Sequence, residues 1–132
     1  MSTSNTPSGI SLTLSPLPHL WLIDIDGTIV THNGHICGQE NLLPGVKEFW
    51  ESIPIIDTII LLTARDVAYT KHTIDLLIKY QLRFDQVISD LPTGERILIN
   101  DSKVSGLQTA IALNISRNKG LDEIELIIDC NK

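Results

Sequence analysis

Three apolar segments of this chain are closed by polar side chains, and this pattern constrains the fold more than any other feature of the sequence. The segments are residues 20–25, 58–62 and 97–99. Continuous apolar runs of this length, rich in branched side chains, indicate strands that are buried on both faces, as in a parallel sheet. Ligands of such sheets bind beyond the carboxyl ends of the strands. The sequence therefore predicts a parallel sheet whose polar strand ends meet at one edge.

Helical segments separate the predicted strands. Residues 46–52 have the pattern of a short helix, and 67–80 carry apolar side chains at helical spacing after Asp66, a typical N-cap residue. We also predict strands at 87–88 and 109–115, the second of which could instead be a short helix. The alternation of strands and helices predicts an α/β fold with a mostly parallel central sheet that helices cover on both faces.

The length of the chain, 132 residues, is typical of one domain. Residues 1–18 are rich in Ser, Thr, Pro and Asn and carry no charged side chain. We therefore predict a flexible arm over 1–18, in which the alternation of Ile10, Leu12 and Leu14 is typical of a short strand at a sheet edge. Residues 19–132 are predicted to form a single domain.

Charge and composition limit the partners and the compartment. Ten Lys and Arg against sixteen Asp and Glu give a net charge of −6, which argues against nucleic acid as a partner, because basic contacts to phosphate supply most non-specific affinity. Asp24 and Asp26 interrupt the longest early apolar run well short of the ~18 residues of a membrane span. The N-terminus lacks the basic and apolar parts of a secretory signal. Cys37 and Cys130 lie far apart, which favours reduced thiols in a cytoplasmic protein over a disulfide.

Asp24 and Asp26 flank a single residue at the end of the first predicted strand. Residues two apart in extended chain point to the same face, so both carboxylates can reach one site, and Gly27 lets the backbone turn tightly. One carboxylate of such a pair can attack phosphorus while the other moves a proton. Close acids repel unless a cation neutralises them, and hard oxygen ligands suit Mg²⁺. The alternative is an ordinary Asp-Gly turn with solvated acids.

Two further strand ends carry polar groups that suit phosphate or metal binding. Thr63 and Ala64 follow the second strand, where a hydroxyl and backbone N–H groups before a helix can hold a phosphoryl oxygen. Asn100 and Asp101 follow the third strand, where Asp101 could complete a metal site. The alternatives are a helix cap shared by Thr63 and Asp66, and a plain Asn-Asp turn.

These residues resemble the motifs of the haloacid dehalogenase-like superfamily of aspartate-nucleophile phosphohydrolases. Residues 24–28, Asp-Ile-Asp-Gly-Thr, match the first motif of that family, Thr63 resembles the second, and Asn100-Asp101 resembles the acidic pair of the fourth. The resemblance covers residues 20–114. It implies a three-layer Rossmann-like fold and a single catalytic domain.

The resemblance also implies a role for each residue. Asp24 would be the nucleophile that forms an aspartyl-phosphate, and Asp26 would be the general acid and then the general base. Thr63 would bind the transferring phosphoryl group, with Gly27 and Ala64 beside it. The implied Mg²⁺ ligands are Asp24, Asp26, Asp101 and Asn100.

The chain departs from the family at the third motif, a Lys or Arg that neutralises the nucleophile and the phosphate. Leu91 stands where the family often has Lys. Lys103 is our first candidate for the replacement cation and is therefore predicted to bind phosphate, and Arg96 and Lys71 are further candidates. The acidic pair reads Asn-Asp instead of Asp-Asp, which removes one charge from the predicted metal site.

The motif spacing leaves no room for a cap domain. Thirty-six residues lie between Asp26 and Thr63 and thirty-six between Thr63 and Asn100, and predicted helices and strands use most of both intervals. Residues 30–43 remain as a flap, and a second copy of the chain could close the open site. The flap residues that could touch a substrate, if they are not simply loop polarity, are Thr31, His32, Asn33 and His35.

We therefore predict a capless, Mg²⁺-dependent phosphatase that acts on a phosphorylated sugar or another small phosphomonoester. The sugar is suggested by a resemblance to small phosphatase-like proteins associated with surface-sugar biosynthesis. One alternative is a binding or regulatory module with weak or no catalysis, which the missing Lys at Leu91 favours. The other is a polynucleotide-end phosphatase, against which the acidic charge argues.

Overall fold

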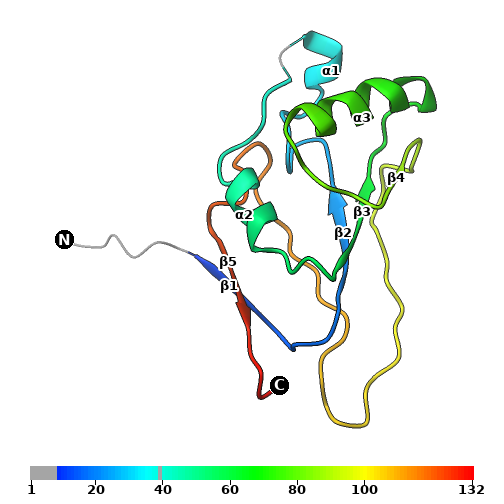
Figure 1. The fold of residues 1–132 in the computed structure, drawn as a ribbon. Coiled ribbons are helices and arrows are strands. Elements are labelled where there is room, and N and C mark those ends of the chain that lie inside the picture. Colours follow the sequence, from blue (N-terminus) through cyan, green and yellow to red (C-terminus); the bar gives the residue numbers. More distant parts are fainter. Residues whose placement is uncertain (1–8, 39) are drawn as a thin grey trace, which may run out of the picture.

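The computed structural model describes residues 9–38 and 40–132 (Figure 1). Its elements are strands β1 (Ile10–Leu14) and β2 (Leu20–Asp24), helices α1 (Gly34–Cys37) and α2 (Val46–Ser52), strand β3 (Thr58–Leu62), the 3₁₀ helix η1 (Val67–Tyr69), helix α3 (Thr70–Lys79), and strands β4 (Gln86–Ile88) and β5 (Ile124–Ile128). Within the predicted arm 1–18, residues 1–8 lie outside the described part of the chain, and β1 is the short strand that the alternation predicts.

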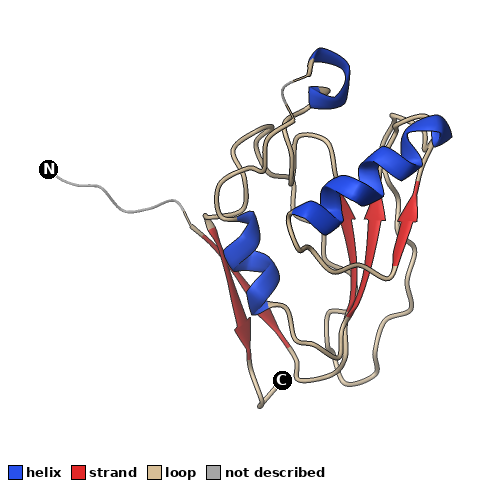
Figure 2. Ribbon diagram, turned by 45° about the horizontal axis from the view of Figure 1, so that its top comes forward, coloured by secondary structure: helices blue, strands red, loops and turns tan. Residues whose placement is uncertain are grey.

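Every strand pairing is parallel, and the strands form two small sheets. One sheet has the order β2-β3-β4, and the other consists of β1 and β5. The helix α2 connects β2 to β3, and α3 connects β3 to β4, as parallel neighbours require. The predicted mixed α/β fold with parallel strands is thus confirmed. The described strands do not form a single sheet, because β1 and β5 pair with each other apart from β2–β4 (Figure 2).

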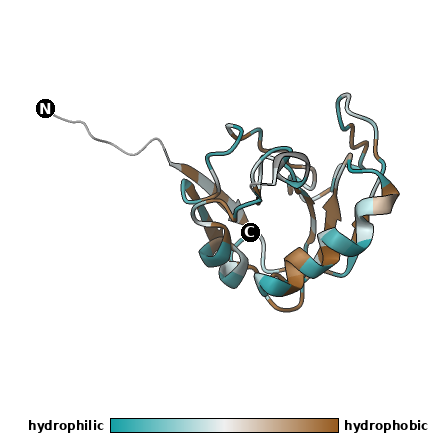
Figure 3. Ribbon diagram, turned by 90° about the horizontal axis from the view of Figure 1, so that it is seen from above, coloured by the Kyte–Doolittle hydropathy of each residue, from teal (hydrophilic) through white to brown (hydrophobic). Residues whose placement is uncertain are grey.

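Helices α2 and α3 lie on the same side of the strands and bury their apolar faces there (Figures 2 and 3). The helix α2 buries Val46, Phe49 and Trp50, and α3 buries Thr73, Leu76 and Leu77. The apolar side chains of this set pack with the inward residues of β2 and β3 in one core cluster. Burial of this apolar surface is the main force that holds the helices against the strands.

Two predicted strands do not form. Residues 97–99 and 109–115 lie in the long loop between β4 and β5 (Figure 1), and Ile97 and Ile99 are 82% and 91% exposed. An apolar, branched run favours extended chain, but a strand exists only where its backbone pairs with a neighbour. Neither β2 nor β4 pairs with these segments.

A buried carboxylate joins the first residues of β2 to the turn before β3. The Asp57 carboxylate accepts hydrogen bonds from the Trp21 indole N–H at 2.9 Å, the His19 backbone N–H at 3.1 Å and the His19 ring Nδ1 at 2.8 Å. Burial raises the pKa of Asp57, but the hydrogen bonds from Trp21 and His19 outweigh it and lower that pKa below its ordinary value. This cluster supports the register in which Asp24 lies opposite Leu62.

The structure bears on the membrane and cysteine predictions at the described residues. No helix in residues 9–38 and 40–132 is long and apolar enough to cross a membrane. Cys130 is exposed and has a free thiol. The side chain of Cys37 lies outside the described part of the chain.

Candidate active site

Asp24 is the last residue of β2, and its carboxylate is bound on both oxygens. The Thr28 hydroxyl donates to Oδ2 at 3.1 Å, and the Arg96 guanidinium donates to Oδ1 at 3.1 Å. The Asp24 side chain is 36% exposed. The carboxylate therefore combines access from solvent with a neighbouring cation, which is the arrangement that an attacking carboxylate needs near a phosphate.

The cation beside Asp24 is Arg96, not Lys103. The sequence made Lys103 the first candidate for this role and Arg96 a further one. In the structure Lys103 lines a different pocket, and Lys71 pairs with Asp75 at 3.0 Å on exposed α3. Arg96 reaches the site because the chain after β4 passes Asp24, a long-range path that residue spacing does not reveal.

Asp26 is held more tightly than Asp24. The Thr63 hydroxyl donates to its Oδ2 at 2.9 Å, and the Arg65 Nε donates to Oδ1 and Oδ2 at 3.0 and 3.2 Å. The Asp26 side chain is 12% exposed and that of Arg65 only 1%. An arginine fork of this kind fixes the orientation of a carboxylate as well as its charge.

Arg65 extends this network to the flap. Its Nη1 donates to the Thr73 hydroxyl of α3 at 3.1 Å, and its Nη2 forms an ion pair with Glu40. The second oxygen of Glu40 lies 2.6 Å from the His72 Nε2. A buried charge pair is favourable only when further hydrogen bonds satisfy its donors and acceptors, and these partners provide them.

The sequence left Arg65 and Glu40 without a role. Arg65 carried a usable signal, since it stands two residues after Thr63 in a segment that leads away from a buried strand, where a buried arginine must be paired. Glu40 had none, because nothing in a polar flap distinguishes one acid from its neighbours.

Gly27 and the loop after β3 shape the backbone of the site. Gly27 is buried with a φ of 83°, a left-handed conformation that favours glycine. Its N–H donates to the Val30 carbonyl at 2.7 Å. Ala64 is exposed beside buried Thr63. The backbone N–H of Leu91 donates to the Thr63 carbonyl at 3.1 Å, so Leu91 holds this loop through its main chain.

His35 brings the flap to Asp26. Its ring is 7% exposed, and its Nδ1 lies 3.8 Å from the Asp26 Oδ1. The ring packs edge-on against Tyr69 with centroids 4.9 Å apart. Burial, with the nearby Arg65 charge, lowers the pKa of His35. Nδ1 is buried and has no hydrogen-bond partner in the described part of the chain.

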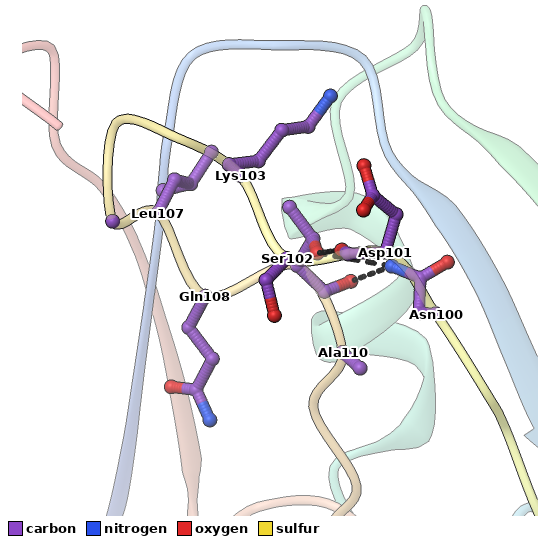
Figure 4. A pocket seen from close by; sticks show the side chains of 9 residues that line it. Asn100, Asp101, Ser102, Lys103, Leu107, Gln108 and Ala110 are labelled. Carbon is purple, nitrogen blue, oxygen red and sulfur yellow. Dashed lines mark hydrogen bonds between the residues drawn. The ribbon is translucent and has the colours of Figure 1, made fainter.

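Asn100, Asp101 and Lys103 lie away from this group, in a pocket of about 360 Å³ within the long loop (Figure 4). The Asn100 amide donates to the Thr109 hydroxyl at 2.9 Å, and that hydroxyl donates to the Asp101 carbonyl at 3.0 Å. Three strand ends were expected to bring polar side chains together, but only the ends of β2 and β3 do so in the described residues. The reason is that residues 97–99 do not join the sheet, so the polar residues after them are not delivered to its edge.

The donors for Mg²⁺ are correspondingly fewer than predicted. No group of three His, Cys, Asp or Glu in the described residues could hold a metal ion. Of the four predicted ligands, Asp24 and Asp26 lie together at the end of β2, and Asn100 and Asp101 line the other pocket. Mg²⁺ in phosphoryl-transfer sites is commonly held by one or two carboxylates, with water and substrate phosphate completing its shell. Of the two carboxylates at the end of β2, that of Asp24 is the more exposed, at 36% against 12%.

The structure thus brings Asp24, Asp26, Gly27 and Thr63 together at the carboxyl ends of β2 and β3. It adds Arg96 on one carboxylate and Arg65 on the other. Scans of protein-family models, of curated proteins and of solved structures find no match to this chain.

Proposed function

We propose that the protein is a Mg²⁺-dependent phosphohydrolase that cleaves a small phosphomonoester through an aspartyl-phosphate intermediate. The observation that carries this proposal is the pair of carboxylates at one strand end, each with its own arginine: Arg96 lies 3.1 Å from Asp24, and Arg65 lies 3.0 Å from Asp26. The haloacid dehalogenase-like assignment, with a three-layer Rossmann-like fold and no cap, belongs to the same proposal.

The reaction divides between the two carboxylates. An Asp24 oxygen attacks phosphorus, the bond from phosphorus to the alcohol oxygen breaks, and Asp26 gives a proton to that oxygen. Asp26 then takes a proton from the water that hydrolyses the aspartyl-phosphate and regenerates Asp24. Thr63 and Arg65 keep Asp26 oriented through both steps.

Charge on the phosphoryl oxygens is balanced by cations. Arg96 can turn from the Asp24 carboxylate towards the oxygens of a bound phosphate, because its side chain is 40% exposed and held at this end by one hydrogen bond. Mg²⁺, held by the Asp24 carboxylate and the Asp26 backbone carbonyl, would neutralise further negative charge there. Most of phosphoryl-transfer catalysis consists of this neutralisation and of positioning.

The proposal is tested by Asp24→Asn with p-nitrophenyl phosphate and Mg²⁺. We expect kcat/KM to fall at least about a thousandfold, since loss of a nucleophile removes the covalent route. Glu125→Gln is the matched control, because it removes one carboxylate from exposed β5 outside the site. Equal activity of Asp24→Asn and the wild type, with both folded by circular dichroism, would exclude this mechanism.

A second candidate function is a non-catalytic module that binds an anionic ligand. Its supporting observation is that Asp101 and Asn100 line a separate pocket, which leaves fewer acidic groups beside Asp24. This candidate predicts no turnover on a panel of phosphate monoesters with Mg²⁺. It also predicts binding of inorganic phosphate that weakens in Arg96→Gln, as calorimetry would measure.

A further inference from the structure

The turn of residues 116–119 (orange in Figure 1) lies against the loop that follows β2. The Asn118 N–H donates to the Gly27 carbonyl at 2.9 Å, and the Asn118 side-chain oxygen accepts from the His32 N–H at 2.8 Å. Asn118 has a φ of 62°, a left-handed conformation that asparagine adopts more readily than most residues. A single residue of the chain before β5 thus holds both the Gly27 turn and the flap.

This docking packs Arg117 over Gly27. A Cβ atom at Gly27 would lie 3.3 Å from the Arg117 Cγ and 3.5 Å from the His32 Cβ. Gly27 directly follows Asp26 and precedes Thr28, whose hydroxyl binds the candidate nucleophile. The aliphatic part of the Arg117 side chain is therefore held beside the turn that carries the catalytic carboxylates.

The guanidinium of Arg117 has no partner in the protein. Arg65 and Arg96 bind the two carboxylates of the site, and Arg83 binds backbone carbonyls. The Arg117 side chain is exposed and makes no hydrogen bond or ion pair within residues 9–38 and 40–132. A guanidinium presents a rigid fork of donors that matches a carboxylate or a phosphate. Arg117 is thus the arginine whose donors remain available to a ligand.

A substrate with a second negative charge needs a cation beyond those of the proposed mechanism. There, Arg96 and Mg²⁺ balance the phosphoryl oxygens, and Arg65 is committed to Asp26 and Glu40. A negative leaving group would be repelled by the Asp26 carboxylate unless a further cation lies near it. Arg117, packed beside the residue that follows Asp26, supplies this positive charge.

We infer that Arg117 binds a carboxylate or a second phosphate on the leaving group, that the substrate is therefore a phosphomonoester with an anionic leaving group, and that Asn118 positions this arginine. The inference rests on the proposed function, since it identifies the substrate class of the same site. The His32 ring can join Arg117 in this contact. Its Nδ1 lies 3.6 Å from the same Cβ position at Gly27, and the ring has no hydrogen bond within the described residues.

The test compares kcat/KM for three esters that share a two-carbon leaving group and differ in its charge. Phosphoglycolate carries a carboxylate, hydroxyethyl phosphate a hydroxyl group and phosphoethanolamine an ammonium group. The wild type should prefer phosphoglycolate to hydroxyethyl phosphate by at least about tenfold, because hydrogen bonds to charged groups are the stronger ones. Phosphoethanolamine should be the poorest substrate. Added KCl should weaken the preference, since it screens an exposed charge.

Variants of the turn assign this preference to its residues. Arg117→Gln should lower the ratio of phosphoglycolate to hydroxyethyl phosphate about tenfold. Arg117→Lys should recover part of the ratio, because it restores the charge but not the fork of donors. Asn118→Gly keeps the left-handed backbone and loses the hydrogen bond to His32, so it should lower the ratio part of the way.

Lys119→Gln is the matched control, because it removes another exposed cation from the same turn, and it should leave the ratio unchanged. The inference is overturned if Arg117→Gln keeps the wild-type ratio, or if Lys119→Gln lowers it equally. It is also overturned if Arg117→Gln lowers kcat/KM on all three esters alike, as a purely structural role would. A wild type that hydrolyses hydroxyethyl phosphate as well as phosphoglycolate overturns it too, and leaves the proposed hydrolase in place.

If the wild type hydrolyses none of the three esters, calorimetry with phosphoglycolate and Mg²⁺ separates the two proposals. Binding that weakens about tenfold in Arg117→Gln supports the anion site without the hydrolase. Binding that is equal in the wild type and Arg117→Gln overturns the anion site, and no binding overturns both proposals.

Discussion

Three basic side chains were candidates for the cation beside Asp24, because each carries a positive charge. Lys103 stands two residues after Asp101, yet it lines the loop pocket. Lys71 is 89% exposed and pairs within its own helix. Arg96, far from Asp24 in the sequence, makes the contact. A basic residue beside Asp24 was predictable, because the negative charges of the carboxylate and of a phosphate need a cation. Which basic residue takes this position depends on the path of the loop after β4.

Loss of the Arg96 side chain should lower catalytic activity strongly and change the stability of the fold only slightly. Arg96→Gln should lower kcat at least about a hundredfold, because the cation that balances charge on Asp24 and on the transition-state oxygens is lost. Its effect on the free energy of unfolding should stay under about 1 kcal/mol, since the ion pair is solvent-exposed. Steady-state kinetics and urea unfolding measure the two quantities.

Lys103→Gln is the control for this prediction, because it removes a cation that lines the other pocket. Its kcat should equal that of the wild type. Loss of activity in Lys103→Gln with full activity in Arg96→Gln would reverse the assignment of the cation.

At the scale of elements, local patterns predicted the structure well where burial and capping act together. Strand β3 and helix α2 have the predicted bounds, and Asp66 caps the next helical segment by accepting from the Ala68 N–H at 2.8 Å. That segment is divided into η1 and α3, a detail that the apolar spacing did not contain. The strands predicted at 97–99 and 109–115 fail for a different reason, since the pattern reports preference for extended chain and not the presence of a partner.

A glycine contact joins two elements that the sequence does not relate. Gly120 has a φ of 83°, and a Cβ atom there would overlap the Pro44 carbonyl oxygen just before α2. The neighbouring Leu121 N–H donates to that same oxygen at 2.8 Å. The chain before β5 is therefore docked closely on the start of α2.

This contact predicts that Gly120→Ala is strongly destabilising. Gly106→Ala is a matched control, because Gly106 has a similar φ of 86° but no atom within 4 Å of the added Cβ. Both variants lose about 1–2 kcal/mol to backbone strain, and Gly120→Ala should lose about 2 kcal/mol more from the overlap. Equal midpoints of urea unfolding for the two variants would show that the close approach has no energetic effect.

For the protein as a whole, the hydrogen-bonded cluster around Asp57 makes the free energy of unfolding depend on pH. The folded pKa of Asp57 is lowered, so its contribution is fully present above its unfolded pKa, about 3.9, and is lost as the pH falls through the lower folded value. Protonation removes the charge that the Trp21 and His19 donors stabilise.

The comparison of wild type with Asp57→Asn tests this dependence. The amide that this substitution introduces has only one acceptor oxygen for the three donors, so the variant should be about 2 kcal/mol less stable near pH 7. The difference should shrink when urea unfolding is repeated near pH 3, because below the unfolded pKa the unfolded state binds a proton that the native carboxylate resists. A difference that stays constant over this range would mean that Asp57 acts through packing and not through its charge.

The sequence was sufficient to predict the strand ends that carry Asp24, Asp26 and Thr63, and the parallel α/β arrangement that brings them to one edge. It could do so because these features follow from short-range patterns: apolar runs, polar residues at their ends, and helices between them. The tertiary structure alone decided that Arg96 faces Asp24, that Arg65 and Glu40 brace Asp26, and that Asp101 stays away from it. The physical reason is that each of these outcomes depends on how the flap and the loop after β4 pack against the sheet, and local residue preferences do not specify contacts between segments so distant in the chain.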